Sequence, residues 1–473
     1  MRRRLLMALF LLPGMGRCGD LPSNIHPELA VIEGPQALSP FAAALNALAA
    51  GTRDRVSVCH FGDSHLQEGE VDQVLRDALQ ARYGNAGRGY VFPYEAMNTG
   101  TPADVGSVTD ADWRLRRMMG DSSGGPVGPG GLAAISSQPN FVLGVDVHGG
   151  SSQASAFDRV KVFYVPGPDK PELWVATRPQ PAHYSAELRN QTWRELTIKS
   201  GDTLSGIAQR EGCTVADLKR WNGATVKLRA GGTVRLWKPV PADAPRMQGF
   251  TVWGVLSGQD PLGPEGVTVD LGSPSDDVFL LGAQTQGASQ HAELQGLVLD
   301  KRGTRGILWH SLAANGAQAK HYAAQPELPE QGRSLAPDLI IVSLGTNETQ
   351  TANYRIQDVL AQQLRFWRVL RQAAPQASLL ICSPPDAGYK HHGSNDRLDA
   401  YVAAIKAQAL NEGAAFLDLR AAQGGAGSYQ RWRAVGLAGK DGVHYKSAGY
   451  RLLGEWTLNA LLSVPGVEGG HAR

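Results

Sequence analysis

The stretch Val56-Ser-Val-Cys-His-Phe-Gly-Asp-Ser64 contains the features that decide the fold. Val56 to Cys59 is a predicted short buried strand, and the polar turn Gly62-Asp63-Ser64 follows it closely. Further on, apolar residues recur at positions 71, 74, 75, 78 and 79, which is one face of a helix, and Gly84 is placed to end that helix. A buried strand followed by a turn and an amphipathic helix is typical of a parallel sheet.

The last third of the chain repeats this alternation. Leu339-Ile-Ile-Val342 is apolar throughout, as expected of a strand that is covered on both faces. Predicted strands lie at 339–342, 378–382 and 414–419, and predicted helices lie at 356–370, 398–410 and 447–462. The sequence therefore predicts an α/β domain with a parallel sheet and helices on both sides.

The segment from about 105 to 304 breaks this pattern. It is rich in Gly, Pro, Ser and Thr and contains short strand-like runs at 141–145, 160–165 and 278–281. Short strands separated by turn-forming residues predict a β-sandwich. Residues from about 195 to 238 form a further unit with helices of its own, so the chain is expected to be nested.

Charge and termini narrow the class of protein. The chain has 46 basic and 44 acidic residues, so its net charge is only +2 and does not favour nucleic-acid binding. Residues 1–19 combine a basic start with eight consecutive apolar residues, which predicts a signal peptide. That run is shorter than the ~20 apolar residues of a membrane span, and no later stretch is long enough. Cys18 leaves lipidation open, although Arg17 departs from the small-residue pattern of lipoproteins. Cys59 and Cys382 each end an apolar run and are expected in the core.

Three short polar patches carry the chemistry. They are Gly62-Asp63-Ser64, Gly345-Thr346-Asn347-Glu348 after the strand at 339–342, and Asp441-Gly-Val-His444 before the last helix. Open α/β sheets build their sites along the edge where the strands end, so the patches are expected to converge. A hydroxyl, an imidazole that takes its proton and a carboxylate that orients the imidazole suit nucleophilic catalysis. We therefore predict Ser64, His444 and Asp441 as a catalytic triad.

These patches, in this order, resemble blocks I, III and V of the SGNH/GDSL hydrolase superfamily. Block II supplies a glycine N–H in that family, and its best match here is Ala314-Asn315-Gly316-Ala317. The resemblance implies a flavodoxin-like three-layer domain and an oxyanion hole formed by Ser64, Gly316 and Asn347. Asp63 is expected to act as a cap, and His65 either to pack or to touch substrate. No metal site and no cofactor is predicted.

Residues Thr197-Ile-Lys-Ser-Gly-Asp-Thr-Leu-Ser-Gly-Ile-Ala208 resemble the opening of a LysM module. This family is a βααβ unit that binds N-acetylglucosamine-containing glycans, usually peptidoglycan or chitin. The resemblance points to Gly201, Asp202, Thr203 and Leu204 as glycan contacts. The same residues have a structural alternative, since the first three also suit a turn and helix cap, and Leu204 suits the core.

The expected boundaries follow from these assignments. They are a signal peptide (1–19), an SGNH hydrolase domain in two parts (40–120 and 305–465), a carbohydrate-binding-module-like β-sandwich insert in two parts (121–193 and 240–304) and the LysM module (194–239).

Two further segments narrow the substrate. Ala86-Gly-Arg-Gly-Tyr-Val-Phe-Pro-Tyr94 and His310-Ser-Leu-Ala-Ala-Asn-Gly-Ala317 resemble parts of bacterial peptidoglycan O-acetylesterases, which carry a similar insert between blocks I and II. We therefore predict an exported enzyme, periplasmic or associated with the cell envelope, that deacetylates peptidoglycan through an acetyl-serine intermediate. Two alternatives stay open: an acetylesterase or lipase acting on another polysaccharide or a lipid ester, and a non-catalytic wall-binding protein.

Overall fold

The computed structural model describes most of the chain. The described residues are 24–467 except 98, 121–124, 137, 139, 149–154, 166, 168–169, 180–192, 223–225, 238–248, 258–262, 284–291 and 390–392. The predicted signal peptide at 1–19, with Cys18, lies outside them. No helix in these ranges is long and apolar enough to cross a membrane.

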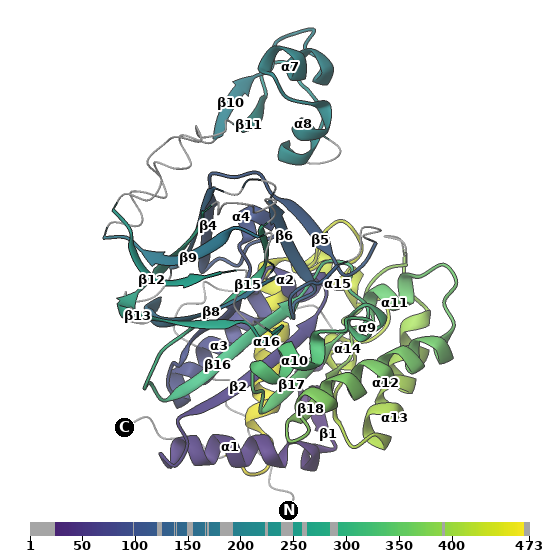
Figure 1. Ribbon diagram of the computed structural model, residues 1–473. Coiled ribbons are helices and arrows are strands. Elements are labelled where there is room, and N and C mark those ends of the chain that lie inside the picture. Colours follow the sequence, from purple (N-terminus) through teal and green to yellow (C-terminus); the bar gives the residue numbers. More distant parts are fainter. Residues whose placement is uncertain are drawn as a thin grey trace, which may run out of the picture.

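A six-stranded sheet forms the centre of the α/β part (Figure 1). Its order is β1-β19-β18-β17-β2-β16, and every neighbouring pair is parallel except the short edge strand β1 with β19. The strands are β1 (Ile32–Glu33), β2 (Arg55–Gly62), β16 (Gly306–Ala313), β17 (Leu339–Ser343), β18 (Ser378–Cys382) and β19 (Ala415–Leu417). The predicted parallel sheet is therefore confirmed.

Helices cover both faces of this sheet. The side chains of β2 point alternately to the two faces, so each face presents apolar residues to a layer of helices. Val56 and Val58 belong to one hydrophobic core, shared with α1 (Ser39–Ala49), α3 (Glu70–Tyr83) and α16 (Ser447–Leu462). Cys59 and Phe61 point the other way, into a core shared with α12 (Ile356–Ala373) and α13 (Arg397–Asn411). Cys59 and Cys382 are both buried with free thiols, as predicted. The shorter helices are α2 (Ser64–Gln67), α4 (Tyr94–Met97), α9 (Ala319–Ala323), α10 (Leu328–Ser334), α11 (Thr346–Gln350), α14 (Leu419–Gln423) and α15 (Ser428–Ala434), with 3-10 turns at Pro27–Leu29 and Pro35–Leu38.

Several element boundaries differ from expectation by one to three residues, as at α12, which continues to Ala373, and at the strands β2 and β19. Strand β2 continues three residues past Cys59 to Gly62, so the polar turn begins later than its apolar run suggests. Strand β19 ends at Leu417 rather than at residue 419. The reason is Asp418, whose side chain accepts a hydrogen bond from the N–H of Ala421 and caps α14.

Two antiparallel sheets occupy the middle of the chain. One has the order β12-β9-β14-β7-β4 and the other β13-β8-β15-β6-β5, with β3 also pairing with β15. The predicted runs at 141–145, 160–165 and 278–281 fall in β7, β8 and β14. The strands are β3 (Gly87–Val91), β4 (Val105–Thr109), β5 (Arg114–Arg117), β6 (Leu132–Ser136), β7 (Phe141–Val147), β8 (Phe157–Tyr164), β9 (Glu172–Thr177), β12 (Thr251–Leu256), β13 (Val267–Ser275), β14 (Asp277–Ala283) and β15 (Ala292–Asp300).

Strands β3, β4 and β5 lie within 40–120, the segment that we expect to belong to the hydrolase domain. They nevertheless pair with strands of the antiparallel sheets. The close approach of β3 to β16 depends on glycine, because a Cβ at Gly89 would lie 1.7 Å from the carbonyl oxygen of Trp309. Strand β3 therefore contacts both the parallel sheet and an antiparallel one.

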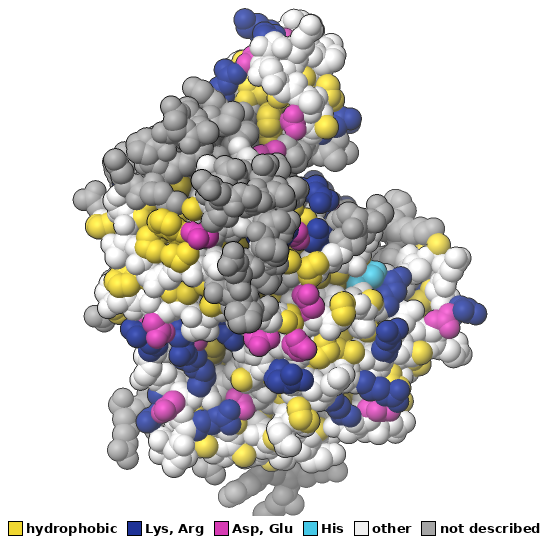
Figure 2. Space-filling view, in the orientation of Figure 1, with side chains coloured by type: hydrophobic (Ala, Val, Ile, Leu, Met, Phe, Trp, Pro, Cys, Tyr) yellow, Lys and Arg dark blue, Asp and Glu magenta, His cyan; other side chains and the backbone are white. Residues whose placement is uncertain are grey.

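A small separate unit lies between β9 and β12 in the chain (Figure 1 and Figure 2). It consists of β10 (Trp193–Thr197), α7 (Leu204–Glu211), α8 (Val215–Asn222) and β11 (Thr233–Trp237). The two strands pair antiparallel, with Trp193 opposite Trp237. The unit has its own hydrophobic core, to which Ile207, Ala208 and Leu218 contribute buried side chains.

Candidate active site

Ser64 lies where β2 ends and is the first residue of α2. Asp63 caps this short helix, because its Oδ1 accepts a 3.0 Å hydrogen bond from the backbone N–H of His65. Gly62 permits the sharp turn, since a Cβ there would lie 2.3 Å from Leu66 Cδ1. The serine is thus presented at the edge of the sheet on a tight strand-to-helix turn.

His444 and Asp441 reach Ser64 from the loop before α16. His444 Nε2 is 2.8 Å from Ser64 Oγ, and His444 Nδ1 is 2.5 Å from Asp441 Oδ2. The structure therefore brings together the three residues that the sequence singles out. A hydroxyl, an imidazole and a carboxylate in this order can pass a proton from serine to histidine while the carboxylate orients the ring.

Asp441 is held in place by its other oxygen. Oδ1 accepts hydrogen bonds from the backbone N–H groups of Val443 (3.1 Å) and His444 (3.0 Å), and the hydroxyl of Tyr429 lies 3.2 Å away. Partial burial alone would raise the pKa of Asp441, but the bonds from the His444 side chain and from the two backbone N–H groups hold it well below its usual range. The carboxylate is therefore ionised wherever the enzyme is folded near neutral pH.

The predicted oxyanion residues lie around the same turn. Gly316 is in the turn 314–317 with φ of +81°, a conformation that favours glycine. This turn is tied to the serine helix, because Gln67 Oε1 accepts a 2.6 Å hydrogen bond from the backbone N–H of Asn315. The N–H groups of Ser64 and Gly316 donate to no other described residue, so both are available to a substrate oxygen.

Asn347 stands differently from the two backbone donors. Its Nδ2 donates to Asp63 Oδ2 (3.0 Å) and to the carbonyl oxygen of Ala317 (3.1 Å), so both amide hydrogens already have acceptors. A substrate oxyanion would have to replace the carbonyl of Ala317 or share its hydrogen. Asn347 therefore lies beside the serine turn, and its amide connects that turn to the turn at 314–317 by two hydrogen bonds.

Two buried polar residues, Asp63 and His65, flank Ser64 in the serine turn. Burial raises the pKa of Asp63 to about 6, although bonds from His65 and Asn347 oppose that rise. His65 Nδ1 is 3.0 Å from the hydroxyl of Tyr450, and burial lowers the pKa of His65 to about 3, so this ring is neutral. Its ring centre lies 5.6 Å from that of His444, which fits the packing alternative for His65.

Two contributors carry no signal in the sequence. Tyr429, in α15, and Gln67, in α2, touch the site only because the fold brings distant segments together. Neither belongs to a motif, so only the three-dimensional contacts identify them. No group of three His, Cys, Asp or Glu side chains that could hold a metal ion occurs within the described ranges.

Three of the four predicted glycan contacts of the small unit, Asp202, Thr203 and Leu204, have partners within the unit. Thr203 caps α7 by accepting a 3.0 Å bond from the N–H of Gly206. Asp202 accepts from the N–H of Lys199 (2.8 Å) and from Arg210 (3.1 Å), and Gly201 has φ of +88°. Leu204 is partly buried against the core of the unit. The side chains of Asp202 and Thr203 thus shape the turn at the start of α7.

Two protein families match separate parts of the chain. Residues 281–452 match the GDSL-like lipase/acylhydrolase family, a range that includes Gly316, Asn347, Asp441 and His444 but not Ser64. Residues 196–236 match the LysM domain. No curated protein matches the chain.

One solved structure has a fold that matches nearly the whole chain. A structure described as a peptidoglycan O-acetylesterase in action matches with a TM-score of 0.62 at 20% identity, over 91% of this chain and 97% of the other. A carbohydrate esterase of family 3 from Talaromyces cellulolyticus matches at 18% identity over 32% of this chain and 70% of its own, with a TM-score of 0.27. A GDSL-like lipase from Bacteroides thetaiotaomicron matches at 17% identity over 32% and 75%, with a TM-score of 0.26.

The fold and the family match together make serine esterases the class of protein that this chain resembles. More particularly, residues 281–452 are similar to the GDSL-like lipases and acylhydrolases, and residues 196–236 are similar to LysM domains.

Proposed function

We propose that the chain is an exported carbohydrate esterase that removes O-acetyl groups from N-acetylmuramoyl residues of peptidoglycan. The observation that carries this proposal is the union of a GDSL-type hydrolase with a LysM domain in one chain. The fold likeness to a peptidoglycan O-acetylesterase extends over nearly the whole length of both chains and supports it.

In the proposed reaction, His444 Nε2 takes the proton of Ser64 Oγ as that oxygen attacks the acetyl carbonyl. The tetrahedral oxyanion is stabilised by the N–H groups of Ser64 and Gly316, and by Asn347 if its amide turns from Ala317. Collapse of this intermediate expels the sugar hydroxyl, which receives the proton from His444. The product of this half-reaction is an acetyl-serine.

Water completes the cycle. His444 takes a proton from a water molecule, the hydroxide attacks the acetyl-serine, and acetate leaves as Ser64 Oγ regains its proton. Asp441 remains ionised throughout and stabilises the imidazolium that forms twice in each cycle. All steps use groups of this chain and water.

The openness of the site supports a polymeric substrate. The side chains of His444 and Asp441 are 41% and 44% exposed, so a sugar within a long glycan can approach the serine from outside. A lipid substrate is better served by a deep apolar pocket. This exposure favours peptidoglycan or another polysaccharide over a lipid ester.

The remaining parts of the chain fit the same proposal. The LysM domain at 194–239 would hold the enzyme on glycan, and the two antiparallel sheets would form a β-sandwich of the carbohydrate-binding type. Residues 1–19 would direct export, which places the enzyme in the periplasm or at the cell envelope.

Acetate release from O-acetylated peptidoglycan tests the proposal. The wild type and a Ser463→Ala control, altered at an exposed serine after α16, should release acetate, whereas Ser64→Ala should not. Acetylated xylan and a long-chain ester are measured in parallel. A preference for either of them would contradict the substrate, and full activity of Ser64→Ala would contradict the mechanism.

A further inference from the structure

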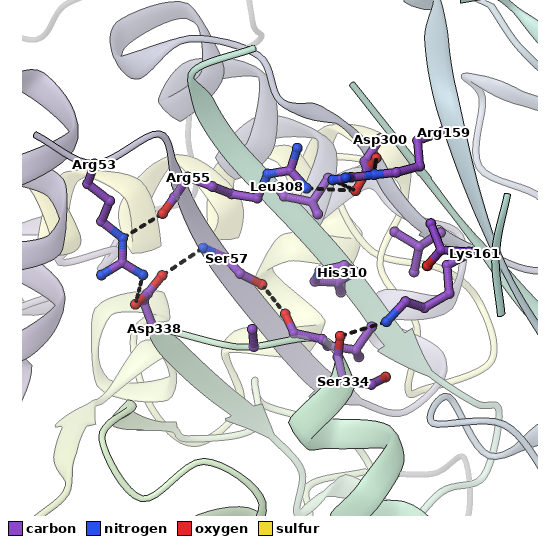
Figure 3. A pocket seen from close by; sticks show the side chains of 14 residues that line it. Arg53, Arg55, Ser57, Arg159, Lys161, Asp300, Leu308, His310, Ser334 and Asp338 are labelled. Atoms are coloured by element: carbon purple, nitrogen blue, oxygen red, sulfur yellow. Dashed lines mark hydrogen bonds and ion pairs between the residues drawn. The ribbon is translucent and has the colours of Figure 1, made fainter. Parts of the chain in front are cut away.

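A cavity of about 340 Å³ lies between the hydrolase sheet and one antiparallel sheet (Figure 3). Strands β2 and β16 form one wall, and β8, β13 and β15 form another. Arg55 and Ser57 line the cavity and lie seven and five residues before Gly62, the last residue of β2. By the rise of an extended strand they are roughly 23 and 17 Å from the end of β2, beyond which Ser64 lies. It is therefore distinct from the esterase site, and its size is that of a small-molecule site.

The walls of this cavity carry more positive than negative charge. Four cations line it, namely Arg53, Arg55, Arg159 and Lys161, against the two carboxylates of Asp300 and Asp338. The surplus is two positive charges.

The ion pairs show where the two surplus positive charges lie, one at Lys161 and one where two arginines share a single carboxylate. Arg53 pairs with Asp338 at 2.6 Å, and Asp300 is shared by Arg55 (2.6 Å) and Arg159 (2.7 Å). Lys161 Nζ donates only to the neutral carbonyl oxygen of Ser334, at 2.9 Å, and no carboxylate of a described residue pairs with it. Figure 3 shows this ammonium on the cavity wall, directed at the carbonyl oxygen of Ser334. An anion placed there would meet a donor that holds no counter-charge.

The wall also contains a polar side chain without a partner. His310 is 1% exposed, and neither of its ring nitrogens has a hydrogen-bond partner within the described structure. Burial, with the nearby charges of Lys161 and Arg55, lowers its pKa to about 3, so the ring is neutral. A neutral imidazole offers one donor and one acceptor, which is the complement of a hydroxyl group.

We propose that this cavity is a second binding site, for a sugar-sized ligand that carries a carboxylate or a phosphate. The acidic group would lie against Lys161 and the guanidinium groups beside it, and a hydroxyl group would reach His310. A neutral sugar would leave the surplus charge unmatched. The proposal does not depend on the reaction at Ser64.

Calorimetric titration of the full chain tests the site with three probes. N-acetylmuramate and N-acetylglucosamine differ by a lactyl carboxylate, and glucose 6-phosphate carries a phosphate instead. We expect at least one acidic sugar to bind about tenfold or more tightly than N-acetylglucosamine, as charge-assisted hydrogen bonds imply. Which of the two acidic probes binds more tightly identifies the acidic group. Added salt should weaken this binding, because three of the four cations that line the cavity are partly exposed to solvent.

Variants separate this cavity from the esterase site. Lys161→Met should weaken binding about tenfold, while Lys406→Met, a half-buried lysine paired with Glu33 elsewhere, should bind as the wild type does. Should Lys161→Met fail to fold, Thr268→Glu adds a carboxylate from an exposed position of the cavity wall and should have the same effect. Ser64→Ala should bind normally. Equal affinity for the acidic and the neutral sugars, or unchanged binding by both cavity variants, would mean that the charges only join the two sheets.

Discussion

Replacing Asp441 with Asn should disable the proposed triad by fixing the wrong tautomer of His444. Asp441 Oδ1 accepts two backbone N–H groups, those of Val443 and His444, and an amide nitrogen cannot take that place. The amide oxygen of the variant must therefore occupy it. The amide nitrogen then faces His444 Nδ1, where it donates a hydrogen bond and leaves the ring proton on Nε2. That nitrogen, 2.8 Å from Ser64 Oγ, can no longer accept the serine proton.

The expected loss is about 10³-fold in kcat with little change in KM. In a serine protease triad the same substitution costs about 10⁴-fold. We expect somewhat less here because the Asp441 side chain is 44% exposed, so that water can reach the ring and help it change tautomer. A loss of 10³ corresponds to about 4 kcal/mol in the activation free energy. Hydrolysis of p-nitrophenyl acetate measures it, with Asp358→Asn, an exposed carboxylate paired with Arg355, as the control.

Comparison with Asp441→Ala makes the test sharper. Alanine removes the carboxylate but places no donor against the ring, so water can take its place and the productive tautomer can form. We expect Asp441→Ala to be at least as active as Asp441→Asn. The reasoning is refuted if Asn keeps kcat within tenfold of the wild type, or if Ala is much the weaker variant while both remain folded.

Three further outcomes follow from the structure. Tyr429→Phe should lower kcat on p-nitrophenyl acetate by only about threefold to tenfold, because two backbone N–H groups still hold Asp441. A loss as large as that of Asp441→Asn would contradict this expectation and give the Tyr429 hydroxyl a larger role. Burial raises the pKa of Glu348 to about 7, so the folded state keeps a proton that the unfolded state releases above about pH 4.5, and stability falls as pH rises through this window. Urea unfolding should show Glu348→Gln equal to the wild type near pH 4 and more stable by roughly 3 kcal/mol at pH 8. The same gain at both pH values would exclude ionisation as its cause. Deleting 194–236 should leave p-nitrophenyl acetate hydrolysis unchanged and lower acetate release from insoluble peptidoglycan, since Trp193 and Trp237 lie opposite each other and can be joined directly. Equal activity of the deletion variant and the wild type on both substrates would contradict the targeting role.

Local patterns predicted the α/β part well. The last helix is expected at 447–462 and occupies those residues in α16, and the helix expected to end at Gly84 does so as α3. Both depend on apolar spacing and end signals within a few turns of chain, which the sequence displays directly. The predicted C-terminal end of β19 lay two residues too far along the chain. Asp418 caps helix α14, so the strand stops before it although Leu419 is apolar.

Contacts between distant segments were less accessible. The pairing of β3 with β15 joins residues about two hundred positions apart, and the sequence Gly87–Val91 does not predict which strand it pairs with. The same holds within the site. The spacing of Asp441 and His444 is visible in the sequence. The contact of Tyr429 with Asp441 is not, because it depends on how the fold places distant segments. The same is true of the two hydrogen-bond acceptors of Asn347.

The position of β3 also bears on how the molecule melts. This strand pairs with β15, and residue 85, just before it, bridges to Ile307 of β16, so neither sheet can lose its order without disturbing the other. In a calorimetric scan both sheets should absorb heat in one cooperative transition. The LysM unit, which packs around Ile207 and Leu218 of its own, should melt as an independent step.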